Sequence, residues 1–275
     1  MSENLDYWHR QSEKKLFADV DLESPEQRRF AGKLLIIGGN KGLFFAVASA
    51  LEEAKRFGVG EVRALMPDVL SSKLPSTPEL YFAEAEASGA FGRTALTEML
   101  RQAEWSDAVL LVGDSGKNAE TSVVFAEFME KCQKPIFITR DAVDAVVSSA
   151  MDWSMRDYET GLLLTMPQLQ KLLRSLYYPK VITLSMPTNQ LVETLHKFTL
   201  SYGISLMTFH NGLLVTAQNG EVVSQEIEGT SLTPITLWGG ALITDAIVAR
   251  LWNIEKPFYK VFATVLAEKR QLRSR

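Results

Sequence analysis

The feature that most constrains the fold of this chain is a repeated alternation between short apolar runs and longer segments with helical spacing. The apolar runs are KLLIIGG, VGEVRALMP, DAVLLVGDSG, KPIFITRD, GLLLT and KVITLS. KLLIIGG in particular is short, continuous and ends in glycines, as in a strand that is buried on both faces of a parallel sheet. Gly58 is placed to end the first helical segment. The alternation predicts an α/β fold in which helices cover both faces of a mostly parallel sheet.

The pattern changes after Gly203, where apolar and polar residues alternate along ISLMTFHNGLLVTAQNGEVVSQEIE. Two Asn-Gly pairs interrupt this stretch, Asn211-Gly212 and Asn219-Gly220. Such pairs favour the tight turns of β-hairpins, because both residues accept positive φ angles. We therefore expect the sheet to include antiparallel strands near the C-terminal end of the chain.

The domain organisation follows from the same pass along the chain. Residues 1–30 are polar and charged, and we expect them to form an N-terminal arm that packs either on another subunit or on its own domain. Residues 31–275 contain no linker, repeat or low-complexity tract. They are expected to form a single α/β domain.

Composition argues against several classes of protein. Of the 275 residues, 46% are hydrophobic and 23% are charged, and the net charge is −4, so the basic stripe of a nucleic-acid-binding protein is not expected. One cysteine and three scattered histidines do not have the spacing of a metal site. No apolar run is long enough to span a bilayer, and the first residues lack a leader pattern. We therefore expect a cytoplasmic protein that binds neither nucleic acid nor a membrane. We expect no side chains that coordinate a metal ion.

Polar and glycine-rich loops follow three of the predicted strands. Ligands in an open parallel sheet bind beyond the carboxyl ends of the strands. The candidate substrate-binding residues at this edge are Gly39, Asn40, Lys41, Gly113, Asp114, Ser115, Lys117, Asn118 and Asp141. Neither glycine loop has the spacing of a dinucleotide fingerprint or a Walker A motif. Ligand-free tight turns, a helix cap at Asp141 and a solvated Lys117 are therefore alternatives.

A second candidate site lies in the segment TPITLWGGALITDAIVARL. Gly239 and Gly240 open a long apolar helix, and the free N–H groups of a helix start can bind an anion. A phosphoryl-transfer enzyme would also need a carboxylate beside the glycines. The nearest one is Asp245, more than one helical turn further along.

The order of these loops resembles the ribokinase-like superfamily, and within it the ADP- or ATP-dependent NAD(P)H-hydrate dehydratases, over about residues 31 to 255. KLLIIGGNKG is similar to the family's opening strand and glycine loop, and DAVLLVGDSGKNAET to its Gly-Pro-Gly-Leu-Gly loop. KPIFITRDAV is similar to its Asp-Ala-Asp-Ala-Leu run, with Asp141 at the second aspartate. The hairpin followed by TLWGGALITDAIVARL resembles its closing Gly-x-Gly-Asp-Val-Leu segment.

The resemblance implies a three-layer α/β/α fold of the ribokinase type. It also implies ADP or ATP as cofactor, with or without Mg²⁺, a small-molecule nucleotide as ligand, and assembly into a homo-oligomer. The cofactor-binding residues that it implies are Asn211, Gly212, Gly239, Gly240 and Ala241.

The chain departs from the family at the positions that carry the chemistry. Thr165-Met166-Pro167-Gln168 stands where the family has Thr-Pro-His-x-Gly-Glu, and His210-Asn211-Gly212 stands where it has Lys-Gly. Ala241 occupies the position of the family's catalytic aspartate. Because alanine cannot take a proton, Asp245 is the remaining candidate for a catalytic residue.

Three functions are compatible with these observations. A divergent NAD(P)H-hydrate dehydratase would bind adenine nucleotide at Gly239–Gly240 and a nicotinamide nucleotide or another small metabolite at the strand ends. A catalytically inactive descendant would act as a nucleotide sensor or a structural subunit. A small-molecule kinase of the same superfamily would use Asp245 as its base.

Overall fold

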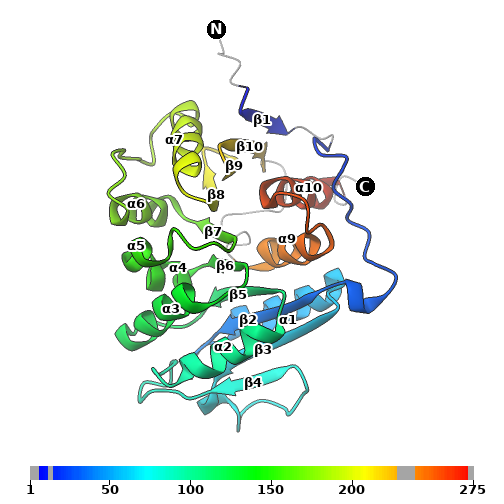
Figure 1. The fold of residues 1–275 in the computed structure, drawn as a ribbon, viewed down its shortest axis with the longest axis vertical. Coiled ribbons are helices and arrows are strands. Elements are labelled where there is room, and N and C mark those ends of the chain that lie inside the picture. The colour runs from blue at the N-terminus through cyan, green and yellow to red at the C-terminus, as the bar shows by residue number, and fades with distance from the viewer. Residues whose placement is uncertain (1–5, 12–14, 228–238, 272–275) are drawn as a thin grey trace.

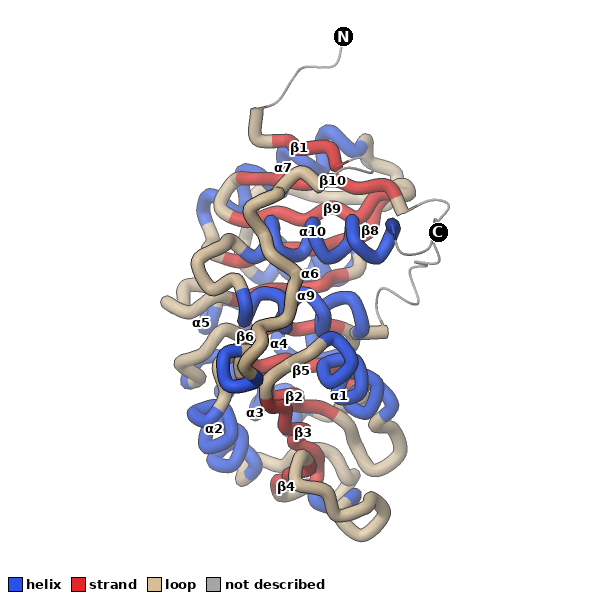
Figure 2. The backbone as a smooth tube through the Cα atoms, turned by 90° about the vertical axis from the view of Figure 1, so that its right-hand side faces the viewer, coloured by secondary structure: helices blue, strands red, loops and turns tan. Residues whose placement is uncertain are grey.

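The computed structural model describes residues 6–11, 15–227 and 239–271. Its centre is a ten-stranded sheet with the order β1-β10-β9-β8-β7-β6-β5-β2-β3-β4. Figure 2 shows these strands stacked from β1 at the top to β4 at the bottom. The strands are β1 (Trp8–Gln11), β2 (Lys33–Gly38), β3 (Glu61–Pro67), β4 (Leu80–Ala83), β5 (Ala108–Gly113), β6 (Ile136–Thr139), β7 (Thr160–Leu164), β8 (Ile204–His210), β9 (Leu213–Gln218) and β10 (Glu221–Glu226).

Nearly all neighbouring strands pair in parallel. The β8–β9 and β9–β10 pairs are antiparallel, so among the described strands β9 alone runs against the others. Both turns of this region have positive φ angles at their two central residues: 48° and 76° at Asn211 and Gly212, and 51° and 82° at Asn219 and Gly220. These angles match the predicted Asn-Gly hairpins. The prediction of a mostly parallel sheet with antiparallel strands near the C-terminal end is confirmed.

Helices cover both faces of the sheet (Figure 1). One face carries α1 (Phe45–Phe57), α9 (Ala241–Trp252) and α10 (Phe258–Gln271). The other carries α2 (Ala95–Trp105), α3 (Ala119–Lys131), α4 (Asp141–Val146), α5 (Ala150–Trp153), α6 (Met166–Ser175) and α7 (Thr188–Ser201). The predicted three-layer α/β/α architecture is confirmed.

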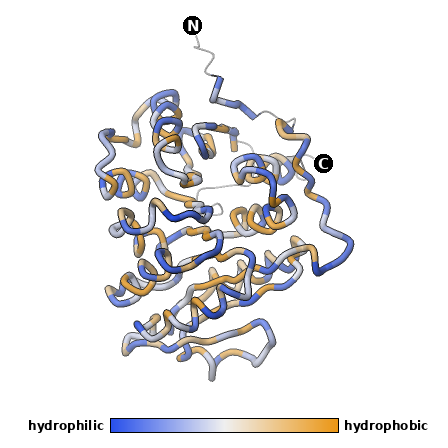
Figure 3. The backbone as a smooth tube through the Cα atoms, in the orientation of Figure 1, coloured by the Kyte–Doolittle hydropathy of each residue, from blue (hydrophilic) through white to orange (hydrophobic). Residues whose placement is uncertain are grey.

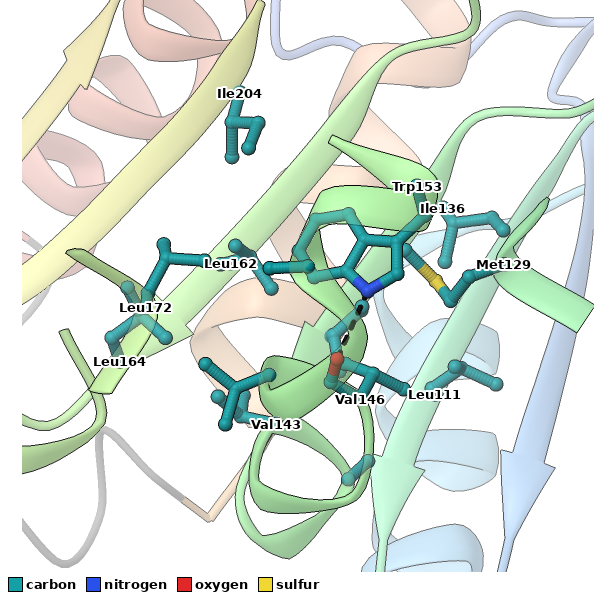
Figure 4. Packing of buried hydrophobic residues seen from close by; sticks show 14 of the residues in the cluster. Leu111, Met129, Ile136, Val143, Val146, Trp153, Leu162, Leu164, Leu172 and Ile204 are labelled. Atoms are coloured by element: carbon teal, nitrogen blue, oxygen red, sulfur yellow. Dashed lines mark hydrogen bonds between the residues drawn. The ribbon is translucent and has the colours of Figure 1, made fainter. Parts of the chain in front are cut away.

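Alternating strand residues separate two hydrophobic cores. Along β5, Val109 and Leu111 face the core under α2–α7, whereas Leu110 and Val112 face the core under α1, α9 and α10. Figure 4 shows part of the first core, where Trp153 is 1% exposed. Its indole Nε1 donates a hydrogen bond to the carbonyl oxygen of Val146 at 2.9 Å. The one polar atom of this large side chain is thus satisfied inside the core.

The predicted strand KVITLS is wrong, because residues 180–185 form no strand. Val181 and Leu184 are 73% and 70% exposed, whereas Ile182 is buried. The run is bounded by Pro179 and Pro187, and prolines disfavour central strands. The place beside β7 is taken by β8, which the sequence assigns to the hairpin region.

The N-terminal segment packs on its own chain. β1 pairs in parallel with β10, and the Nε1 of Trp8 donates to the Oγ of Ser224 at 2.8 Å. Further along, the Nδ2 of Asn253 donates to the carbonyl oxygen of Asp21 at 2.6 Å. The outer part of this segment, at the right of Figure 3, is largely hydrophilic. Within residues 6–11, 15–227 and 239–271, no helix combines the length and the hydropathy of a bilayer span.

Candidate functional site

The loops after β2 and β5 pack directly against each other at the carboxyl edge of the sheet. The N–H group of Gly39 donates to the carbonyl oxygen of Gly113 at 2.9 Å. The Nδ2 of Asn40 donates to the carbonyl oxygen of Asp114 at 2.6 Å. A Cβ atom at Gly38 would lie 2.4 Å from the carbonyl oxygen of Gly113. The two loops can therefore come this close only because residue 38 is glycine. Candidate residues from two separate loops are thus brought together.

The carboxylate of Asp141, which follows β6, fills the loop after β5. Its Oδ1 accepts the N–H group of Asp114 at 2.7 Å, and its Oδ2 accepts those of Ser115 and Gly116 at 3.0 and 3.2 Å. Asp114 and Gly116 have φ angles of 57° and 77°. Such turns direct successive N–H groups toward one anion. The loop is therefore an anion-binding turn, and the anion in it belongs to the chain itself.

Asp114 holds the start of α1 in a similar way. Its Oδ2 accepts the N–H group of Ala46 at 2.6 Å, and its Oδ1 accepts a hydrogen bond from the Nη2 of Arg140 at 2.6 Å. Asp114 is 2% exposed, whereas the side chain of Arg140 is 29% exposed, so only the carboxylate of this pair is buried. Both acidic residues at this edge are therefore engaged in holding loops and helix starts.

The other candidate substrate-binding residues line the same edge without forming a closed cluster. Lys41 and Lys117 are exposed. The backbone N–H of Lys41 donates to the carbonyl oxygen of Gly89 at 2.8 Å. Asn118 is the N-cap of α3, and its Oδ1 accepts N–H groups from the first turn of that helix.

The structure also assigns roles to residues that sequence reasoning missed. Gln168 forms a capping box with Thr165 at the start of α6, and its Nε2 donates to the carbonyl oxygen of Arg140 at 2.8 Å. Arg140 has a φ angle of 59°, which is strained for a residue with a side chain. The signal in the sequence was the position of Arg140, directly after a buried strand and directly before Asp141.

The segment at Gly239–Gly240 does open a helix at this edge. Gly240 is the N-cap of α9 with a φ angle of 96°, and a Cβ atom there would lie 3.2 Å from the Cγ2 of Val112 in β5. The first intrahelical hydrogen bond runs from the N–H of Thr244 to the oxygen of Gly240 at 3.0 Å. Within the described residues, the N–H groups of residues 241–243 have no hydrogen-bond partner. This helix start therefore presents free donors to an anion.

Asp245 lies elsewhere, in a buried charge cluster between α1 and α10. It is 0% exposed, its Oδ2 forms an ion pair with Lys269, and the Nη2 of Arg56 is 3.9 Å away. Lys269 also pairs with Glu53 at 3.2 Å. Burial raises the pKa of Asp245 to about 7, although the charge of Lys269 opposes the shift. A catalytic role for Asp245 would require it to leave this cluster.

The two remaining cofactor-binding candidates, Asn211 and Gly212, form the turn between β8 and β9. The Nδ2 of Asn211 is 3.4 Å from the carbonyl oxygen of Met186. In the part of the chain that the structure describes, no group of three or more His, Cys, Asp or Glu side chains is arranged to hold a metal ion.

Sequence comparison finds no matching family model. Part of the chain is similar to two bifunctional NAD(P)H-hydrate repair enzymes. The protein from Methanothermobacter thermautotrophicus is 33% identical over 116 residues, which are 41% of this chain and 22% of that protein. The protein from Moorella thermoacetica is 24% identical over 138 residues, which are 46% of this chain and 24% of that protein. The match thus spans about a quarter of the length of these relatives.

Structural comparison covers nearly the whole chain. A ribokinase-like superfamily protein from Enterococcus faecalis V583 aligns with a TM-score of 0.70 and 15% identity, over 96% of this chain and 87% of that one. The ADP/ATP-dependent NAD(P)H-hydrate dehydratase from Bacillus subtilis, co-crystallised with ATP and Mg²⁺, aligns with a TM-score of 0.55 and 13% identity, over 90% and 82%. These alignments confirm the ribokinase-like fold that the sequence predicts.

Proposed function

Because the chain has a ribokinase-like fold and is distantly related in part of its sequence to NAD(P)H-hydrate repair enzymes, we propose that it is a divergent dehydratase-like protein that binds ADP or ATP. The nucleotide phosphates would lie at the start of α9. The observation that carries the proposal is the set of free N–H groups at residues 241–243, next to Gly240. The first N–H groups of a helix have no intrahelical acceptor, and together with the helix dipole they can hold a phosphate at this position.

The second ligand would bind at the edge formed by the loops after β2, β5 and β6. We propose a nicotinamide nucleotide or another small hydroxylated metabolite for this position. The exposed ammonium groups of Lys41 and Lys117 supply positive charge for the diphosphate of such a ligand. Asp141 and Asp114 keep the two glycine loops in the shape that receives it.

Bound ADP or ATP would supply phosphoryl transfer to the hydroxyl group of a hydrated nicotinamide nucleotide, ahead of elimination. The residues of this chain favour binding and orientation over proton transfer. Ala241 cannot accept the proton of the substrate hydroxyl, and Asp245 is held by Lys269. Turnover is therefore expected to be slow compared with an enzyme that has a general base at position 241.

The same observation favours a second candidate function, a catalytically inactive nucleotide-binding protein. Both candidate functions place a nucleotide at the start of α9. They differ in whether the protein then catalyses a reaction. Restoration of NADH absorbance from its hydrate, in the presence of ADP or ATP, would select the first. Nucleotide binding without that activity would select the second. A kinase that uses Asp245 as base has less support, because Asp245 lies in the cluster with Lys269 and Glu53.

The test is isothermal titration of ADP and ATP, with and without Mg²⁺, into the wild type and two charge variants. Ala241→Glu adds a carboxylate at the first residue of α9, and Thr188→Glu adds one at the first residue of α7. Acidic residues suit helix N-termini, so both variants should fold. We expect Ala241→Glu to weaken binding about tenfold or more and Thr188→Glu to leave it unchanged. Absence of binding to the wild type, or equal binding by all three proteins, contradicts the proposal.

A further inference from the structure

The carboxyl end of β6 buries a hydroxyl group that lacks a partner. Thr139 is 0% exposed, and among the described residues nothing hydrogen-bonds to its Oγ1. Most buried hydroxyl groups in proteins have a partner, because an unsatisfied one destabilises the fold. The hydroxyl of Thr139 is therefore able to donate a hydrogen bond to a group that the described residues do not supply.

Thr139 lies on the face of the sheet that α9 covers. Successive side chains of a strand point to opposite faces. Phe137 belongs to the core under α1, α9 and α10, and Ile138 belongs to the opposite core, so Thr139 shares the face of Phe137. In β7 its register partner is Leu163, which faces the same core.

The register with β5 places Thr139 beside the start of α9. Leu111 pairs with Ile138, so the next residue, Val112, lies next to Thr139. Val112 is the side chain that a Cβ atom at Gly240 would approach at 3.2 Å. Thr139 and the start of α9 therefore both lie next to Val112 on this face of the sheet, although they come from distant parts of the sequence.

We propose that Thr139 is a further ligand-binding residue, whose hydroxyl donates a hydrogen bond to the terminal phosphate of the nucleotide held at the start of α9. The inference rests on the function proposed above. A hydroxyl is a neutral donor, so it can contact the phosphate directly, without a bridging cation. A bound phosphate would thus satisfy both the hydroxyl and the helix start, which are otherwise left without partners.

Another buried hydroxyl provides a matched control. Thr208, in β8, is also 0% exposed and lacks a partner for its Oγ1 within the described residues. It shares its face with Leu206, which belongs to the core under α2–α7, so it lies on the side of the sheet away from α9. Valine at either position keeps the shape of the side chain and removes the hydroxyl.

The experiment compares Thr139→Val, Thr139→Ser and Thr208→Val by isothermal titration with ADP and ATP and by thermal melting without nucleotide. Both valine variants should melt at or above the temperature of the wild type, because each loses an unsatisfied hydroxyl. Thr139→Val should bind nucleotide about tenfold more weakly, whereas Thr139→Ser and Thr208→Val should stay within about twofold of the wild type. If Thr139→Val fails to fold, Thr139→Ala replaces it, with the same expected loss.

The outcomes separate this inference from the proposed function. If the wild type binds nucleotide, Ala241→Glu abolishes binding and Thr139→Val keeps full affinity, the role of Thr139 is overturned and the helix-start site stands. Equal loss in Thr139→Val and Thr208→Val also overturns it, since the effect is then not local to α9. If the wild type binds neither ADP nor ATP, both proposals fail.

Discussion

The carboxylate of Asp141 accepts the N–H group of Asp114 at 2.7 Å, and this contact closes the glycine loop after β5 around an anion of the chain's own. The start of α9, at the same edge of the sheet, has free N–H groups at residues 241–243 within the described chain. Two anion-binding turns thus lie at one edge, one filled by a side chain and one open. This difference supports the proposal that nucleotide phosphates bind at the start of α9, because the N–H groups inside the loop after β5 already have the carboxylate of Asp141 as their acceptor.

Removing the internal anion should destabilise the protein. Asp141→Ala leaves the N–H groups of three loop residues without their acceptor. We expect the free energy of unfolding in urea to fall by about 1–3 kcal/mol. The control is Asp144→Ala in the same helix, which removes a partly exposed ion pair with Lys171 and one hydrogen bond from the Nε2 of Gln168. Because that Nε2 keeps its bond to the carbonyl oxygen of Arg140, this variant should lose less stability than Asp141→Ala. Equal losses in the two variants would contradict the role assigned to Asp141.

The buried carboxyl group of Asp245 should make stability depend on pH. Its pKa is about 7 in the fold against an ordinary value of 3.8, so between about pH 4 and 7 the folded state binds more protons than the unfolded state. The protonated carboxyl of Asp245 contributes its full share to the free energy of unfolding below pH 3.8, the ordinary pKa. This contribution is lost as the pH rises through about 7, the pKa in the folded state. The slope is at most about 1.4 kcal/mol per pH unit. The charge of Lys269 lowers the pKa of Asp245 and narrows the pH window, whereas the charge of Glu53 raises that pKa and widens the window.

Asp245→Asn has no titrating group at this position, so its stability should vary less between pH 4 and 7 than that of the wild type. Denaturant unfolding over this range measures the difference. The exposed Glu52, on the same helix as Glu53, provides a control, and Glu52→Gln should keep the profile of the wild type. A profile of Asp245→Asn that is parallel to the wild type would show that the carboxyl does not titrate in this window.

Periodicity was sufficient for most of the fold, because buried strands and covering helices differ in their hydrophobic patterns. Periodicity predicted a strand wrongly at KVITLS, where the apolar side chains do not share one environment. Val181 is exposed there, whereas Ile182 is buried. It also missed β4, an edge strand that pairs with β3 and has half-buried residues within a segment rich in proline and serine. Burial at the sheet edge depends on tertiary neighbours that a local pattern does not contain.

The sequence predicted which loops meet at the carboxyl edge, since that follows from the order of strands and helices. It could not predict that Asp141 fills the loop at Asp114, because the three N–H groups involved turn inward only when positive φ angles are adopted. The position of Asp245 was also out of reach. Its ion-pair partner Lys269 comes from α10 and its neighbour Arg56 from α1, and helical spacing on α9 does not identify either.

We propose that an aspartate at position 241, where the resemblance to the dehydratases implies the catalytic residue, increases catalysis. Ala241 is the first residue of α9, where an acidic side chain is compatible with the helix. If the site otherwise retains dehydratase geometry, Ala241→Asp should raise the turnover number for repair of NADH hydrate at saturating ADP or ATP by about 10²–10⁴-fold, although its charge should weaken nucleotide binding as that of Ala241→Glu does. Recovery of NADH absorbance measures the rate, with Thr188→Asp as the control for an added charge. Unchanged activity in a variant that still binds nucleotide would favour the catalytically inactive alternative.

The N-terminal strand covers the edge of β10, and its removal should expose that edge to other chains. β1 pairs with β10 from Trp8↔Val222 to Gln11↔Gln225, and the Nε2 of Gln11 also donates to the carbonyl oxygen of Ala263 at 2.8 Å. An uncovered strand edge is a template for association between molecules. Deletion of residues 1–11 should therefore increase the mass measured by light scattering as the concentration rises, and lower the melting temperature. Deletion of residues 1–5 leaves β1 in place and should change neither quantity, whereas equal behaviour of the two deletions would show that β1 does not protect the edge.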